Sequence, residues 1–275
     1  MFGKTMAACC GVLVMTSLAA GQAPRFGWQT GQVLVYRTDH NSAASYVLGE
    51  TTSETKTRVQ SLKRWQVMGV DAAGVATLQM SIQALIFQMV RPDGKTELFE
   101  SAHPENSPEE VRKQFAYVGQ PLLLLRVDGQ GKVVEIKQAE AGHGSMAKFE
   151  SDPPFKLLLP AEALRADLTW ERAYPITLEP PQGAGEKYDA VQRYQCKGVA
   201  ENMATVVLTT EVKNAPAAAE DQIPLWQMQP QGEVVFDTRN GRLLKATLRI
   251  DKEAKIEGGN THFQSVYTEQ YVGDR

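Results

Sequence analysis

The chain has 275 residues and a formal net charge of −3, with 43% hydrophobic and 22% charged residues. This mild acidity argues against nucleic acids and anionic membrane surfaces as main partners, because both attract basic proteins. The length is sufficient to bury a sizeable core without disulfides or metal ions.

The N-terminal residues are predicted to be a cleaved secretory signal. Lys4 provides a small positive charge, and an apolar core follows from Ala7 to Leu18. This core is shorter than the ~20 apolar residues that a membrane span needs. Small residues allow cleavage after Gly21 or after Ala23, and Pro24 is a poor first mature residue. We therefore expect residues 1–21 to be removed.

Two features of this region bear on the compartment and on cysteine chemistry. The letters "LAAG" resemble a bacterial lipobox, but Gln22 follows where lipidation needs a cysteine. Cys9 and Cys10 leave with the signal, so Cys196 is the one cysteine of three that remains, and no intramolecular disulfide can form. The sequence predicts an exported, soluble protein, periplasmic or extracellular, with neither a lipid nor a transmembrane segment after cleavage.

Residues 22–275 are predicted to form one sheet-rich domain. Polar residues cover both faces of 50–61, which indicates an exposed or edge strand. Apolar and polar residues then alternate in 74–90, 203–213 and 241–251, as is typical of antiparallel strands. Phe263, Tyr267 and Tyr271 share one face of a final strand.

Turn residues separate these apolar runs. Asp or Asn stands with Gly at 70–76, 91–97, 127–136 and 236–244, where Gly takes the positive φ that tight hairpins require. A meandering antiparallel sheet is therefore favoured over a parallel one. Calcium loops are the alternative, but they need several oxygen ligands at alternate positions, whereas each turn has one Asp.

Few helices are expected. In 106–119, Ser107 and Glu110 form a capping box, after which Val111 and Phe115 share a face. Short helices are also predicted at 144–151 and 160–168, with the proline-fenced run 152–160 crossing over the core between them. Residues 214–224 are the best loop candidate and leave a two-lobed arrangement open.

The predicted fold class is therefore α+β. A large curved antiparallel sheet, a half-barrel-like meander, has its concave face covered by the Ser107 helix and the crossing 152–160.

Motifs for catalysis and metal binding are sparse. His40, His103, His143 and His262 are far apart in the sequence, and one mature cysteine excludes a structural zinc site of the usual Cys/His spacing. Ser145 follows His143 in "GHGSMA", but the spacing differs from the G-x-S-x-G elbow and favours Ser145 as a helix cap. Cys196 shares an apolar alternation and is expected to be buried. We predict no enzyme activity, no cofactor and no metal.

The strand-turn-strand blocks "RWQVMGVDAAGVATLQM", "LLLRVDGQGKVVEI" and "GEVVFDTRNGRLLKATLRI" carry a resemblance. Behind a signal peptide, they resemble secreted bacterial envelope proteins of unknown function and the lipoprotein-carrier half-barrels. In that carrier family a curved antiparallel sheet wraps around a few helices, and the cavity between them holds acyl chains. The resemblance implies an architecture, and no binding residue is carried over from it.

Two functions follow as expectations. One is an exported envelope protein that binds an apolar small molecule or lipid non-covalently under the curved sheet. The ligand-binding residues expected there are Met80, Ile82, Ile86, Phe115, Leu157, Leu158, Leu159, Leu244 and Leu248. The alternative is a non-catalytic interaction or scaffold protein, with an envelope protein as its partner, in which the same residues form a solid core.

Overall fold

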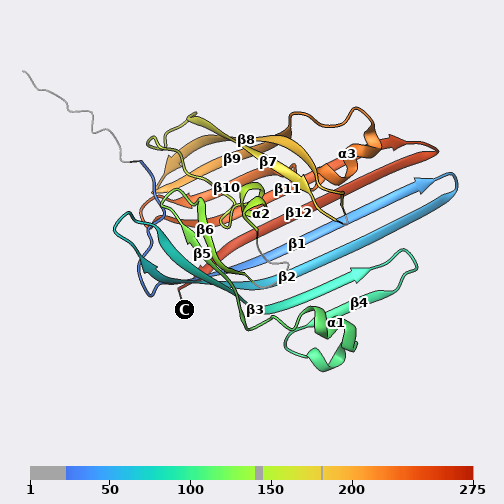
Figure 1. The fold of residues 1–275 in the computed structure, drawn as a ribbon, viewed down its shortest axis with the longest axis horizontal. Helices are drawn as coiled ribbons and strands as arrows, with labels where there is room; N and C mark the ends of the chain where they lie inside the picture. Colours follow the sequence, from blue (N-terminus) through green and yellow to red (C-terminus); the bar gives the residue numbers. More distant parts are fainter. Residues whose placement is uncertain (1–22, 140–144, 181, 275) are drawn as a thin grey trace, which may run out of the picture.

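The computed structural model describes residues 23–139, 145–180 and 182–274 (Figure 1). The predicted signal, its cleavage site, Cys9, Cys10 and His143 lie outside the described residues.

The described strands form one antiparallel sheet. Its path is β6-β5-β3-β2-β1-β12-β11-β10-β9-β8-β7, and β4 pairs with the far half of β3. The sheet is open, because its end strands β6 and β7 do not pair within the described ranges. The strands are β1 Val33–Leu48, β2 Thr51–Val70, β3 Ala76–Val90, β4 Thr96–Glu100, β5 Pro121–Val127, β6 Val133–Ala139, β7 Thr169–Leu178, β8 Glu186–Ala200, β9 Met203–Val212, β10 Gln231–Asp237, β11 Arg242–Ile256 and β12 Gly259–Gly273.

Helices are few and short. In the described residues they are the 3-10 turn η1 Pro104–Asn106 and the α-helices α1 Glu109–Gln114, α2 Met146–Ser151 and α3 Ala219–Trp226. None of them has the length and apolar character that a membrane span requires. Figure 1 shows α2 over the middle of the curved sheet and α1 beside β4 at one corner. The predicted α+β class with a large antiparallel sheet is confirmed.

One face of the sheet carries the main core, and we call it the covered face. Residues 152–160, here named the cover segment, cross this face and bury Phe155, Leu157 and Leu159. The ring of Phe155 lies 5.2 Å from that of Trp65 on β2 and 5.2 Å from that of Phe26. Backbone bonds fix the segment, since Leu159 N–H donates to the carbonyl of Gln130 at 2.9 Å. The predicted crossing over the core is confirmed.

A β-bulge changes which side chains of β3 face the core. Leu62 pairs with Ala84 and Lys63 with Ile82, so one residue of β3 is skipped. After the bulge Leu85 is buried, while Ile86 is 41% exposed on the opposite, open face. The expectation that Ile86 continues the inward face of Met80 and Ile82 is wrong, because unbroken alternation cannot pass through a bulge.

A second bulge has the same effect on β11. Val235 pairs with Lys245 and Phe236 with Leu243, so Leu244 is skipped. Leu243 is fully buried and Leu244 is only partly buried. Leu243 therefore occupies the inward position that was predicted for Leu244, whereas Leu248 and Ile250 face inward as expected.

The strand predicted at 50–61 as exposed or at an edge is exposed: residues 51–58 of β2 are exposed or half-buried, although 56–61 have β1 and β3 on either side. Three further predictions differ from the structure. Residues 160–168 are bends and turns, and the loop candidate 214–224 contains the start of α3. The Ser107 hydroxyl donates to the carbonyl of Leu98 at 2.9 Å, so α1 begins after Pro108 without a side-chain cap. For Ser107, the contact with β4 replaces the local cap that the sequence motif predicts.

Candidate functional site

A groove lies on the covered face between the sheet and α2. Its floor is apolar and consists of Leu248 and Ile250 on β11 and Tyr267 on β12. The volume is about 340 Å³. Residues after α3 form one wall, and α2 with the cover segment forms the other. The wall residues are Gln227, Met228 and Pro230 on one side and Lys148, Ser151, Asp152 and Lys156 on the other, with His40 and Ser265 at the end.

The groove adjoins a second hollow of about 730 Å³. Lys148, Ser151, Gln227 and Met228 line both, so the two hollows lie side by side along α2. The second hollow extends to the edge strand β7 at residues 176–178.

Other hollows of similar volume differ in construction. One of about 420 Å³ is lined by Asn41, Arg58, Gln88 and Val266 with their neighbours, all from β1, β2, β3 and β12. Another of about 470 Å³ is lined only by β7, β8 and β9. These are troughs between neighbouring strands of one sheet. The groove, by contrast, is walled by separate elements above an apolar floor, as ligand sites usually are.

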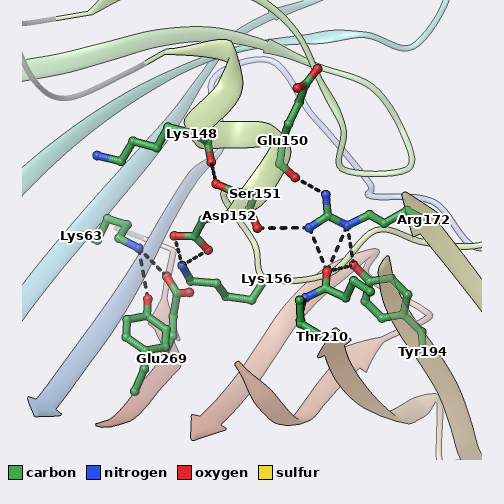
Figure 2. Close-up of polar contacts among 12 residues, drawn as sticks. Lys63, Lys148, Glu150, Ser151, Asp152, Lys156, Arg172, Tyr194, Thr210 and Glu269 are labelled. Atoms are coloured by element: carbon green, nitrogen blue, oxygen red, sulfur yellow. Dashed lines mark hydrogen bonds and ion pairs between the residues drawn. The ribbon is translucent and has the colours of Figure 1, made fainter. Parts of the chain in front are cut away.

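Arg172 on β7 holds α2 in place above the sheet. Its guanidinium donates to the carbonyls of Glu150 and, at 3.3 Å, Ser151, which are among the last carbonyls of α2 (Figure 2). These carbonyls have no partner within the helix, so the guanidinium satisfies them. Arg172 also donates to Gln192 Oε1 at 2.8 Å and to the Tyr194 hydroxyl at 3.1 Å. The wall that carries Lys148 and Asp152 is thereby fixed to β8.

Lys156 in the cover segment lies against the groove floor. Its ammonium pairs with Asp152, 2.6 Å from Oδ2, and lies 4.8 Å from the centroid of the Tyr267 ring. The side chain is 13% exposed. The backbone of Lys156 has a φ of 58°, a left-handed value that directs Phe155 and Leu157 into the core on either side.

A charged pair is buried beside Tyr267. Lys63 Nζ lies 2.9 Å from Glu269 Oε1 and 3.4 Å from the Tyr267 hydroxyl (Figure 2). The Glu269 side chain is fully buried, and its Oε2 has no hydrogen-bond partner in the described part of the chain. Burial, and then the charge of Glu269, raise the pKa of Tyr267 well above its usual value. Tyr267 therefore stays a neutral hydroxyl at the groove floor.

His40 lies at the end of the groove, opposite Tyr267 on the neighbouring strand. Its Nε2 is 2.8 Å from the Ser265 hydroxyl. Desolvation by the surrounding groove, and then the positive charge of Lys156, lower the pKa of the His40 imidazole. His40 is exposed at this end of the groove, and the lowered pKa favours its neutral imidazole.

The predicted ligand-binding residues are only partly brought together. Met80, Leu157, Leu159 and Leu248 belong to the main core cluster, and Ile82 packs against it. Phe115 lies in a separate cluster near α1, where its ring is 5.1 Å from that of Phe87. Leu158 is half-buried, and its carbonyl accepts from Trp170 Nε1 at 2.8 Å. Of the nine residues, Leu248 alone is among the lining residues of the groove.

The sequence reasoning missed most of the groove. Ile250 continues the inward face of Leu248 and could have been included from the alternation alone. Lys156 is the one charge within the apolar run "PPFKLLLP", which is a detectable signal. His40 and Met228 had no such signal. His40 reaches the groove through the pairing of β1 with β12, and Met228 reaches it through the turn that follows α3.

Ser145 and Cys196, two candidates from the sequence, have structural roles. Ser145 caps α2, as its hydroxyl accepts from the Lys148 N–H at 3.2 Å, so the predicted cap is confirmed. Cys196 is fully buried as expected, and burial raises the pKa of its thiol. Within the described ranges no cluster of three His, Cys, Asp or Glu side chains could hold a metal ion.

Comparison with known proteins gives only distant similarity. No protein-family profile matches the chain, and a search of curated proteins finds no match. Solved structures with partial similarity include one titled "Lipid-protein interactions in lipovitellin", at 11% identity and a TM-score of 0.45 over 90% of this chain. This chain spans only 26% of that one.

Two bacterial structures are less similar. An outer membrane channel from Pseudomonas putida F1 has 8% identity and a TM-score of 0.24, over 90% of this chain and 98% of that one. A domain assigned as an outer membrane lipoprotein-sorting protein from Vibrio parahaemolyticus has 11% identity and a TM-score of 0.14, over 87% and 84%. These values assign the chain to none of these families.

Proposed function

We propose that this protein is an exported, non-catalytic envelope protein that binds an apolar or lipid ligand in the groove on its covered face. The observation that carries this proposal is the apolar floor of Leu248 and Ile250 beneath walls that come from other elements. A volume of about 340 Å³ lies within the range of small-molecule sites, roughly 300–1,000 Å³. Met228 in the wall adds a flexible side chain that adapts to variable apolar shapes.

Ile250→Trp tests the proposal, because the larger side chain would occupy the groove above β11. Val266→Trp is the matched control. Val266 is 39% exposed on the open face of the neighbouring strand, where it pairs with Arg249. The measurement is a titration with a fluorescent fatty-acid analogue, together with thermal unfolding of each variant.

We expect saturable binding by the wild type and by Val266→Trp, and none by a folded Ile250→Trp. Equal binding by all three proteins would place the ligand elsewhere and contradict the proposal.

A second function is favoured by the packing of the main core. Phe155 contacts four aromatic rings, those of Phe26, Trp28, Tyr36 and Trp65, at centroid distances of 5.2 to 6.1 Å. This part of the covered face is filled with side chains, as a scaffold protein with a solid core requires. No saturable binding by the wild type, together with simple destabilisation of Ile250→Trp, would favour this alternative.

A further inference from the structure

The groove has an unequal distribution of charge. Lys148 and Lys156 lie along the wall formed by α2 and the cover segment, and Asp152 is the acidic residue of that wall. Arg249 also borders the groove, but it alternates with Leu248 and Ile250, so its side chain is directed to the open face. Asp152 is paired with Lys156. Lys148 forms no ion pair among the described residues, and Figure 2 shows its ammonium directed away from the Arg172 network.

Lys156 occupies a position where glycine would fit the backbone better. A non-glycine residue with left-handed φ costs about 1 kcal/mol, and such strain is concentrated at functional sites. The ammonium is also largely withdrawn from water, and Asp152 is its one ion-pair partner in the described chain. Asp152 itself is 55% exposed and lies at the groove. An anionic head in the groove therefore competes with Asp152 for the Lys156 ammonium.

We propose that the ligand is a single-chain amphiphile with an acidic head. This inference rests on the proposed function and specifies its ligand class. The chain lies on Leu248 and Ile250 against Met228, and the head accepts hydrogen bonds from the ammonium groups of Lys148 and Lys156. The groove above the apolar floor has a volume of about 340 Å³, at the small end of ligand sites, which favours one chain over two. The adjoining hollow beside β7 is lined mostly by polar side chains, among them Thr177, Glu179 and Gln182, and suits a second apolar chain less well. A carboxylate and a phosphate head share this chemistry.

Binding of a fluorescent long-chain fatty acid and of its methyl ester tests the inference in the full chain. Lys148→Gln removes the free ammonium, and Asp152→Asn removes the competing carboxylate. Lys245→Gln is the matched control, because Lys245 is exposed on β11 and pairs with Gln270 away from the groove. Lysophosphatidic acid serves as a competitor with a phosphate head.

We expect the acid to bind more tightly than the ester. Lys148→Gln should weaken acid binding about fivefold, since an exposed ion pair contributes up to about 1 kcal/mol, and Asp152→Asn should tighten it by a similar factor. Neither should change ester binding, and Lys245→Gln should change nothing. Competition by lysophosphatidic acid would extend the site to phosphate heads, and competition by fatty acids alone would restrict it to carboxylates.

Two results would contradict the inference and are distinguishable. Equal binding of acid and ester, unchanged by both groove variants, would overturn the acidic head and leave the apolar site standing. No saturable binding of any of the three probes would overturn the proposed function as well.

Discussion

At the scale of single residues, His40 reports on the charge inside the groove. Desolvation and the nearby Lys156 lower its pKa from the usual value of about 6.5, while Asp152 and Asp39 act weakly in the opposite direction. In the unfolded chain the His40 imidazole therefore binds a proton near pH 6.5, whereas in the folded protein it binds this proton only at lower pH. It follows that His40 contributes stability above this pH, and the contribution is lost as the pH falls towards the folded pKa.

We predict that NMR titration of the His40 ring gives a pKa below 6.5. Lys156→Met should raise it, because the variant removes the positive charge at the groove. Lys245→Met should leave it unchanged, since Lys245 lies on the open face. A wild-type pKa at or above the usual value would show that His40 is not desolvated by the groove. No change in this pKa on Lys156→Met would show that Lys156 does not act on His40.

Some single-residue roles follow from sequence and others do not. Ser145 could be predicted as a cap because its partner is the N–H three residues later. Ser107 also precedes a helix and has Glu110 three residues later, yet its hydroxyl donates to the carbonyl of Leu98 on a neighbouring strand. Short-range chemistry decides the first case, and tertiary packing decides the second.

At the scale of elements, alternation predicts strands well but not the bulges within them. The strands at 76–90 and 242–256 lie where the period of two places them. The bulges that turn Ile86 outward and replace Leu244 by Leu243 depend on the partner strands. Their positions are therefore set by pairing between residues far apart in the sequence.

The β5–β6 turn is the place where three elements meet. Gly131 has a φ of 91°, and a Cβ there would lie 2.6 Å from Phe26 Cε2 and 3.0 Å from the carbonyl oxygen of Leu157. The N-terminal segment, through Phe26, and the cover segment, through Leu157, both pack against this turn. Gly94 in the β3–β4 turn has a φ of 78°, and a Cβ added there would have nothing within 4 Å, so Gly94 shares the conformation without the crowding.

We predict that Gly131→Ala lowers the free energy of unfolding by about 2–4 kcal/mol, from backbone strain and overpacking together. Gly94→Ala should lower it by about 1 kcal/mol from strain alone. Urea unfolding of the two variants measures the difference. Equal destabilisation by Gly131→Ala and Gly94→Ala would mean that the cover segment does not pack closely against the β5–β6 turn.

At the scale of the whole molecule, the covered face has two parts. Around Phe155 the cover segment packs into a dense aromatic core. Along β11 and β12, beyond Lys156, the groove remains between the sheet and α2. The antiparallel sheet could be predicted from the turn residues and alternating runs. The groove could not, because it requires β1, β11, β12, α2 and the end of α3 to meet in space.

The most direct test of the ligand site is a crystal structure of the wild type soaked with a fatty acid brominated at the end of its chain. Anomalous scattering locates the bromine without reference to the shape of the density. We predict a peak in contact with Leu248 and Ile250 on the covered face, with the carboxylate near Lys148. A peak in the open-face trough beside Arg58 and Gln88, or none in crystals of a protein that binds the acid saturably in solution, would contradict the account.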